Sequence, residues 1–314
     1  MDMLNVKNAI LSALTLGGFL LSSMAIAQDQ LILLGTKGGP SLYSTQSLPQ
    51  SSAIQIKNDV YVIDAGYGAS YRLLEAKVPL KNIKAIFITH LHSDHILDYP
   101  ALLMNSWLSS LDHEIQVFGP KGTKEMTENL LKAYNVDIQL RYEDEGREPL
   151  NKFLKVHEFD EGDVYQDENV KVTAKRVPHQ PFKMGEAFAF KFETAQKQNL
   201  VFSGDTNYYP PFAKFAKNAD ILVHEVAHGD GIGRLAKRMG YDESFRDAVI
   251  AHHITPQDVG KTATQAQVKK LVLSHIVPVG DPELTDAVWK KDVGAFYKGE
   301  IVVGKDGMVI PLNQ

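Results

Sequence analysis

The chain has 314 residues, of which 44% are hydrophobic and 23% are charged, and its formal net charge is −5. This composition indicates a globular protein, and the acidic balance argues against the basic surface that a nucleic-acid backbone requires, so no nucleic-acid partner is expected. The sequence contains no cysteine, which excludes disulfides and thiolate metal sites. Any metal ligand must therefore be His, Asp or Glu.

The first 27 residues predict a signal peptide. Lys7 precedes an apolar run at 9–21, and Ala25 and Ala27 occupy the small-residue positions of a cleavage site. The run is shorter than the roughly 20 residues that a membrane span needs. An uncleaved anchor or a buried N-terminal helix is the alternative. We expect cleavage after Ala27, a hydrolase domain at 28–314, a periplasmic or secreted location and no stable membrane insertion.

The first half of the expected domain alternates strands with helices. Strands are predicted at 31–35, 52–57, 60–66 and 84–89. The strand at 84–89 is apolar on both faces, which predicts that it is buried in a sheet covered by helices. Helices are predicted at 69–77 and 96–111, and Pro100 is expected to lie in the first turn of the second helix or to kink it.

The second half repeats this pattern. Strands are predicted at 170–177, 187–194, 200–205, 220–226 and 269–275. Helices are predicted at 210–219 and 255–266, the latter with Thr255 as its cap and Pro256 at its first position. The glycine-containing segment 228–254 is expected to form a long loop. Strands with interleaved helices in both halves predict two packed sheets with helices outside.

The segment 88–95, ITHLHSDH, concentrates metal-binding side chains directly after an expected strand. Residues two apart in an extended segment point the same way, so His90 and His92 can share one ion. Asp94 and His95 fall at the start of the next helix, point elsewhere and can bind a second ion. The spacing predicts two neighbouring metal ions, and a chance cluster on a surface loop is the alternative.

Three further polar residues, His179, Asp205 and His275, each follow an apolar run that is typical of a strand. One edge of a sheet would gather them beside the segment 88–95. The predicted ligands are His90, His92 and His179 for site one, Asp94, His95 and His275 for site two, and Asp205 as the bridge. Such a set leaves room between the ions for a water or hydroxide, as a catalytic site requires.

The chain resembles the metallo-β-lactamase superfamily over nearly all of residues 28–314. The resemblance rests on the HxHxDH motif at 90–95, on His179, on GDT at 204–206 and on His275. It implies a single-domain α/β protein, an αββα sandwich of two mixed β-sheets flanked by helices, with a dinuclear site along one edge. True β-lactamases of this superfamily usually lack the bridging aspartate, and several use a cysteine at the second site.

The bridging Asp205 is a feature of the phosphodiesterase, ribonuclease Z, lactonase and arylsulfatase branches. A resemblance to the zinc-dependent arylsulfatases, which are relatives of ribonuclease Z, rests on the segments LLGTKGGP, DAGYG, MNSWLSS, VFGPKGT, LVHEV, HHITPQDV and LVLSHIVP. This branch implies an anionic ester as substrate.

The ribonuclease Z pattern also implies roles beside the metals. There, the glutamate of a HEAT segment and the histidine of an HST segment act as a pair, and Glu225 and His253 match them. The resemblance implies that His253 donates a proton to the leaving oxygen and that Glu225 orients it; purely structural pairing is the alternative. Asp94 is expected to be both ligand and proton acceptor, and Asp64 to orient a ligating histidine.

We therefore expect an exported, arylsulfatase-like hydrolase of small sulfate or phosphate esters that uses a hydroxide held by two zinc ions, although manganese or iron also suits these ligands. The expected partner is a small anionic ester, and a homodimer is left open. Alternatives are a phosphodiesterase, phosphotriesterase or lactonase of the same fold, or a metal-binding protein without turnover. Lys37 lies in a glycine-rich loop, and Trp107, Tyr67 and Tyr208 are left open between pocket lining and packing.

Overall fold

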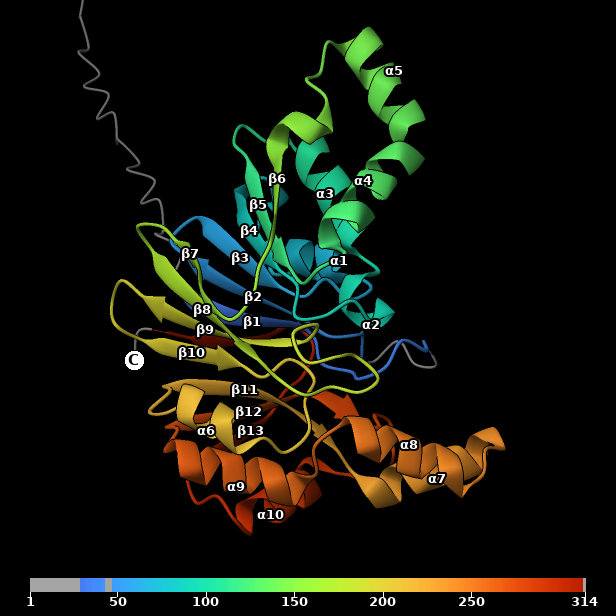
Figure 1. Cartoon of the computed structure of the whole chain (residues 1–314), viewed down its shortest axis with the longest axis vertical. Coiled ribbons are helices and arrows are strands. Elements are labelled where there is room, and N and C mark those ends of the chain that lie inside the picture. Colours follow the sequence, from blue (N-terminus) through green and yellow to red (C-terminus); the bar gives the residue numbers. More distant parts are fainter. Residues whose placement is uncertain (1–28, 43–46, 313–314) are drawn as a thin grey trace, which may run out of the picture.

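The computed structural model describes residues 29–42 and 47–312. Two β-sheets pack face to face and helices cover the outer face of each, so the layers run helix, sheet, sheet, helix (Figure 1). The predicted single-domain αββα sandwich is confirmed. The predicted signal peptide at 1–27 lies outside the described residues and stays a prediction.

The first sheet has seven strands within the described residues, in the order β14-β1-β2-β3-β4-β5-β6. Its strands are β1 (Gln30–Gly35), β2 (Ser51–Ile56), β3 (Asp59–Ile63), β4 (Ile83–Phe87), β5 (Ile115–Gly119), β6 (Leu154–Glu158) and β14 (Met308–Pro311). Strands β3 to β6 pair in parallel, whereas β14, β1, β2 and β3 pair antiparallel. The sheet is therefore mixed.

The second sheet is built in the same way, and its order in the described chain is β13-β12-β11-β10-β9-β8-β7. Its strands are β7 (Gly162–Gln166), β8 (Val170–Arg176), β9 (Phe188–Thr194), β10 (Asn199–Phe202), β11 (Ile221–Ala227), β12 (Lys270–Val277) and β13 (Glu300–Val303). Strands β10 to β13 pair in parallel, and β7 to β10 pair antiparallel.

Helices enclose the two sheets. They are α1 (Ala69–Glu75), α2 (Ser93–Ile96), α3 (Tyr99–Leu108), α4 (Thr123–Ala133), α5 (Asn135–Glu145), α6 (Pro210–Phe215), α7 (Gly229–Met239), α8 (Glu243–His252), α9 (Pro256–Ala266) and α10 (Asp286–Gly294), with short 3-10 turns at Leu80–Asn82 and Leu150–Phe153. Helices α1, α3 and α4 pack on the first sheet, and α6, α9 and α10 pack on the second.

A buried aromatic cluster joins the inner faces of the sheets. The Phe87 ring on β4 lies 5.2 Å from the ring of Phe118 on β5, and 5.6 Å and 5.0 Å from those of Phe190 and Phe192 on β9. Each of these side chains is at most 5% exposed. Burying a phenylalanine contributes about 1.5–3 kcal/mol, so this cluster holds the two sheets in a fixed relation.

Local signals in the sequence set several helix starts. Pro100 lies in the first turn of α3, and Thr255 caps α9 by accepting a hydrogen bond at Oγ1 from the Asp258 amide at 3.3 Å. The expected loop at 228–254 is instead largely helical, forming α7 and α8. Its glycines favour a loop, but Ile232 and Ala236, four residues apart, give α7 a buried stripe that stabilises a helix.

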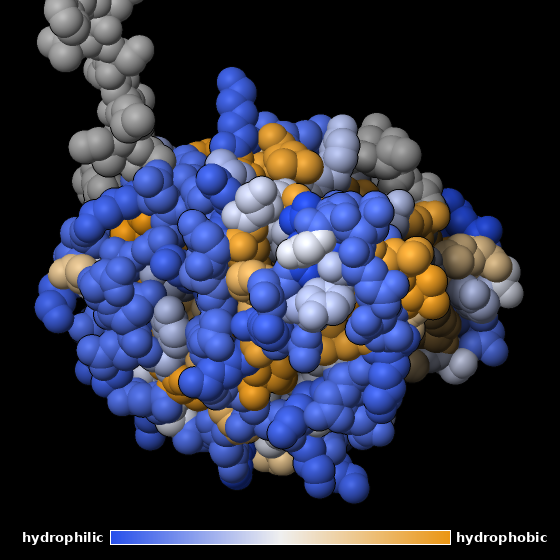
Figure 2. Space-filling model, turned by 90° about the horizontal axis from the view of Figure 1, so that it is seen from above, coloured by the Kyte–Doolittle hydropathy of each residue, from blue (hydrophilic) through white to orange (hydrophobic). Residues whose placement is uncertain are grey.

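The face of the protein seen from above is mostly hydrophilic (Figure 2). Figure 2 shows one face, where hydrophilic side chains cover most of the area and hydrophobic ones form separate patches between them. Scattered exposed apolar side chains are ordinary on a folded protein. Within residues 29–42 and 47–312, no helix combines the length and the hydropathy that a membrane span requires.

Candidate dinuclear metal site

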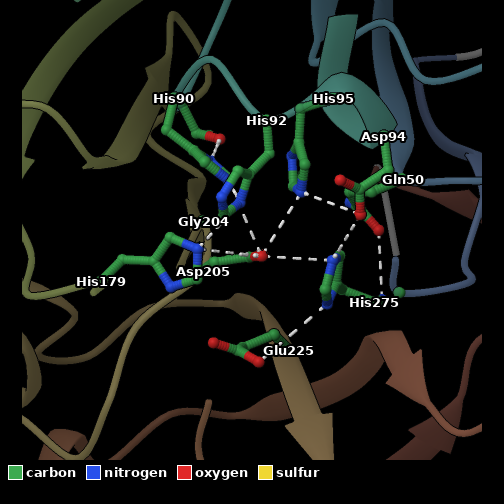
Figure 3. Close-up of polar contacts among 12 residues, drawn as sticks. Gln50, His90, His92, Asp94, His95, His179, Gly204, Asp205, Glu225 and His275 are labelled. Carbon is green, nitrogen blue, oxygen red and sulfur yellow. Dashed lines mark hydrogen bonds and ion pairs between the residues drawn. The ribbon is translucent and has the colours of Figure 1, made fainter. Parts of the chain in front are cut away.

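Strand ends from both sheets bring the predicted ligands together. Strand β4 leads into His90, and α2 directly afterwards carries Asp94 and His95. Strand β10 leads into Asp205, and β12 carries His275 near its end. Since β10 and β12 run parallel to β11, their carboxyl ends meet at the same edge of the second sheet. Figure 3 shows the side chains converging around Asp205.

The first cluster consists of His90, His92, His179 and Asp205. His92 Nδ1 lies 3.0 Å from His90 Nε2 and 3.1 Å from His179 Nε2. Asp205 Oδ2 lies 3.8 Å from His90 Nε2 and 3.7 Å from His179 Nε2. Three imidazole nitrogens and one carboxylate oxygen thus face a common point.

The second cluster consists of Asp94, His95 and His275. Asp94 Oδ2 lies 3.8 Å from His95 Nε2 and 3.3 Å from His275 Nε2. Asp205 Oδ2 is again close, at 3.5 Å from His95 Nε2 and 3.2 Å from His275 Nε2. The same oxygen of Asp205 therefore faces both clusters, as a bridging ligand would (Figure 3).

These spacings fit metal ligands. Atoms bound at 2.0–2.1 Å to a tetrahedral zinc ion are about 3.3 Å from one another, close to the separations within both clusters. Among the described residues, His95 Nε2 and Asp205 Oδ1 are buried and have no hydrogen-bond partner. Burying such atoms unpaired costs free energy, which a bound cation would offset. The described residues are suited to a dinuclear metal site.

Outer contacts orient the ligands. His95 Nδ1 donates to Asp64 Oδ2 at 2.8 Å, which turns its Nε2 toward the cluster. The backbone amide of Thr89 donates to Asp64 Oδ1 at 2.8 Å, and Thr89 Oγ1 lies 3.0 Å from His90 Nδ1. The orienting contact expected of Asp64 is present. A hydrogen bond of this kind fixes the tautomer and ring orientation of a ligating histidine.

Two supporting residues were missed by the sequence reasoning. Gln50 Oε1 accepts hydrogen bonds from the His275 amide at 3.1 Å and from Ser274 Oγ at 2.8 Å, which supports His275 in a left-handed backbone conformation with φ of 43°. The Phe182 ring lies 4.6 Å from that of His92 and covers the first cluster. Gln50 is 225 positions from His275 and carries no motif, so no sequence signal indicates its contact.

Burial and charge set the protonation of the site. Burial lowers the pKa of His179 to about 4 and holds the pKa of His90 well below its usual range, which favours the neutral imidazole that a metal requires. Burial alone would also lower the pKa of His95, but Asp205 and Asp64 outweigh it and raise that pKa well above the usual range. The surrounding histidines hold the pKa of Asp205 well below its usual range despite burial.

A second ion pair lies beside the clusters. His253 Nδ1 donates to Glu225 Oε2 at 2.7 Å, and both side chains lie at the edge that holds Asp205. Burial lowers the pKa of His253, but the Glu225 carboxylate outweighs this and raises it to about 9. Burial raises the pKa of Glu225. The sequence-predicted pair is therefore in contact and next to the ligands.

The side chains left open by the sequence divide between cavity and core. Lys37 lines the cavity beside the clusters, and its Nζ donates to the carbonyl oxygens of Gly38 and Gly39. Burial lowers the pKa of Lys37 to about 8. Trp107 packs in the core on α3 and does not line this cavity, and its Nε1 donates to the carbonyl of Glu148 at 2.8 Å. Tyr67 and Tyr208 lie outside the cavity on the described surface.

Comparison with known proteins assigns the family. The model of the family described as "Anti-Pycsar protein Apyc1" matches residues 30–275, which is most of the chain. The chain belongs to this family. The matched region begins at β1 and ends at His275, so the Apyc1 family match spans all the predicted ligands.

Curated relatives and solved structures agree with the metallo-β-lactamase fold. Ribonuclease Z of Mycobacterium marinum is 29% identical over 280 residues, covering 88% of this chain and 96% of that protein. The metallo-β-lactamase fold protein YhfI from Bacillus subtilis superposes with a TM-score of 0.67 at 19% identity over 90% of this chain and 99% of that one. Human tRNase Z, short form, superposes with a TM-score of 0.64 at 21% identity, over 91% of this chain and 100% of that one. The chain is a metal-dependent hydrolase of this superfamily, in its ribonuclease Z-like branch.

These relatives correct three expectations. An exported, arylsulfatase-like hydrolase of small sulfate or phosphate esters is wrong, because the curated relatives are named Ribonuclease Z. The exclusion of nucleic acid is wrong for the same reason: a net charge of −5 averages over the whole surface and says nothing about one binding face. The expectation of a periplasmic or secreted location is also wrong, again because the curated relatives are named Ribonuclease Z.

Proposed function

We propose that this chain is a zinc-dependent phosphodiesterase that cleaves nucleotide phosphodiester bonds. The observation that carries the proposal is the shared carboxylate: Asp205 Oδ2 lies 3.2 Å from His275 Nε2 in one cluster and 3.7 Å from His179 Nε2 in the other. Two adjacent cations suit the attacking and leaving oxygens of a phosphodiester. The name of the curated relatives, Ribonuclease Z, supports the same type of bond.

Zinc is the cation that the ligand set favours. Histidine and aspartate without cysteine give the nitrogen and oxygen ligands of catalytic zinc sites, although manganese and iron accept similar ligands. When bound, zinc supplies Lewis-acid chemistry that lowers the pKa of water and neutralises charge on the phosphate. We assign the ligands His90, His92, His179, Asp94, His95 and His275, with Asp205 between them.

The chain itself supplies the proton transfers. Asp94 Oδ2 accepts a hydrogen bond from the Gly39 amide at 2.8 Å and lines the cavity, where it can accept the proton of an attacking water. His253 also lines the cavity, and Glu225 fixes its ring by the 2.7 Å hydrogen bond at Nδ1. This leaves Nε2 of His253 as the atom that donates a proton to the departing oxygen.

A panel of nitrophenyl esters tests the proposal. Purified zinc-loaded protein should hydrolyse bis(p-nitrophenyl) phosphate with a kcat/KM at least about tenfold above those for p-nitrophenyl phosphate and p-nitrophenyl sulfate. The reason is that a site that is complementary to the transition state of a phosphodiester stabilises that of a monoester or a sulfate less well. Asp205→Asn is the control, since a contaminating enzyme would keep its activity. Faster turnover of the sulfate or the monoester would reject the phosphodiesterase assignment.

A further inference from the structure

A cavity of about 390 Å³ opens beside the two clusters. His92, Asp94, Asp205 and His275 are among the residues that line it, so the cavity adjoins the proposed reacting centre. Pockets for small ligands have volumes of about 300–1,000 Å³ and are lined mainly by apolar side chains. The cavity therefore has room for part of a substrate next to the scissile bond.

Helices α7 and α8, together with the turn between them that contains Tyr241, supply one wall of this cavity, and the wall is apolar. Its side chains are Ile232, Leu235, Met239, Tyr241, Phe245 and Val249. The two helices pack on each other and project together from the body of the protein (Figure 1). No residue of α8 is fully buried, so its apolar side chains contribute little to a core. Phe245 and Val249 line the cavity instead.

The spacing of these residues explains the wall. Ile232, Leu235 and Met239 recur at intervals of three and four residues and share one face of α7, while Lys237 and Arg238 are exposed. The Tyr241 and Phe245 rings stack with centroids 4.7 Å apart and planes 21° apart, so each ring keeps one outer face on which a further flat ring can stack.

The loop that contains Gly38, Gly39 and Pro40 also lines the cavity. Among the described residues, Lys37 is the only Lys or Arg side chain that lines the cavity. Its Nζ donates hydrogen bonds to the carbonyl oxygens of Gly38 and Gly39. A second phosphate would require more cationic donors than this. The chemistry of the walls fits an uncharged, flat ring.

We propose that α7 and α8 form a base-binding wall that stacks the nucleobase adjacent to the scissile phosphodiester. The proposal rests on the proposed phosphodiesterase function and names the group that the site recognises beside the phosphate. Bases stack on aromatic side chains because each base presents a π face, and the contact tolerates different bases. Phe245 and Tyr241 are the residues assigned to stacking, and Leu235 and Ile232 support the ring edge.

The dinucleotide ApA and two analogues test this wall. In each analogue, a tetrahydrofuran residue replaces one adenosine, so the phosphodiester is kept and one base is lost. Loss of the base that stacks should lower kcat/KM by about tenfold or more through a higher KM, and loss of the other base should cost less. Equal kcat/KM for all three would overturn the base-binding wall and leave the phosphodiesterase intact.

Two further outcomes separate the proposals. Hydrolysis of bis(p-nitrophenyl) phosphate without hydrolysis of ApA would also overturn the wall and leave the function. Failure to hydrolyse any of these diesters with two zinc ions bound would reject the function itself.

Variants locate the contact. In wild type, kcat/KM for ApA should be about ten times that for the analogue that lacks the stacking base. Phe245→Ala should bring this ratio to near one. Tyr142→Ala on α5 is the matched control, because this aromatic side chain is exposed and lies outside the cavity, and the ratio should stay at the wild-type value. Tyr241→Ala provides a second test if Phe245→Ala does not fold. An unchanged ratio in the folded wall variants would overturn the proposal.

Discussion

Asp205 is the residue on which the two clusters depend. Its side chain is 2% exposed, and its Oδ2 lies within 3.8 Å of histidine nitrogens from both clusters. An isolated carboxylate at such depth would be costly, but the surrounding histidines hold its pKa well below the usual range. A single buried carboxylate thus faces both ligand clusters.

The two outer histidines separate the metal positions. His179→Ala should chiefly empty the first site and His275→Ala the second, so each variant should bind about one zinc per chain and lose at least about 100-fold in activity. His113→Ala, a histidine outside both clusters, is the control. Bound metal is counted by elemental analysis. Two metals and normal activity in both ligand variants would show that these residues are not ligands.

His253 is expected to matter most for poor leaving groups. A nitrophenolate leaves without a proton, whereas an alkoxide needs one, and general acid help contributes about 100-fold to 10,000-fold. His253→Ala should therefore cost little on a nitrophenyl diester and much on an alkyl diester, and Glu225→Gln should show a smaller version of this trend. The measurement is kcat/KM across diesters of rising leaving-group pKa.

Parallel dependences for wild type and His253→Ala would exclude His253 as the acid. Metal content is the control, because His253 also lies within reach of Asp205 and His275 as a third potential ligand group. A loss of metal in His253→Ala would make it a ligand instead.

At the scale of elements, the ends of strands position the ligand clusters, and α7 and α8 form the proposed base-binding wall. The sequence predicts the strands before His90, Asp205 and His275 because each is a short apolar run that ends in a polar residue. It does not predict α7 and α8, since Gly231 and Gly233 favour a loop and tertiary packing overrides them. The local sequence pattern is sufficient to predict a strand that is buried on both faces. It is insufficient to predict helices such as α7 and α8, whose apolar side chains line a cavity.

Strand β11 contains a buried histidine whose charge should affect stability. His224 is fully buried, its Nδ1 donates to the carbonyl of Glu225 at 2.9 Å, and its ring packs edge-on against that of Phe212 on α6. Burial lowers the pKa of His224 to about 4. Between this value and the ordinary pKa of about 6.5, the unfolded chain binds one more proton than the folded chain.

The contribution of His224 is therefore complete above about pH 6.5 and is lost as the pH falls toward 4, by up to about 3 kcal/mol. His224→Gln should lose less stability than wild type over this range. Urea unfolding at pH 7.5, 6.0 and 5.0, with metal removed by a chelator, measures the difference. Equal losses in the two proteins would show that His224 is not held neutral.

At the scale of the whole molecule, both sheets end their parallel strands at one edge, which is where the site lies. The resemblance to the superfamily predicts the sandwich and the ligand set, because the ligands lie in compact motifs. The support of His275 by Gln50 and the covering of His92 by Phe182 arise only when distant segments pack together. The net charge also led to the wrong exclusion of a nucleic-acid partner, since it averages over the whole surface.

Titration of the metal-free protein with zinc tests the central claim most directly. Bound zinc and the rate of bis(p-nitrophenyl) phosphate hydrolysis are measured in the same samples as zinc is added. Because Asp205 faces two ligand clusters, activity should rise and reach its plateau at two zinc ions per chain. Full activity with one zinc bound, or no hydrolysis of the diester with two bound, would contradict a two-metal phosphodiesterase.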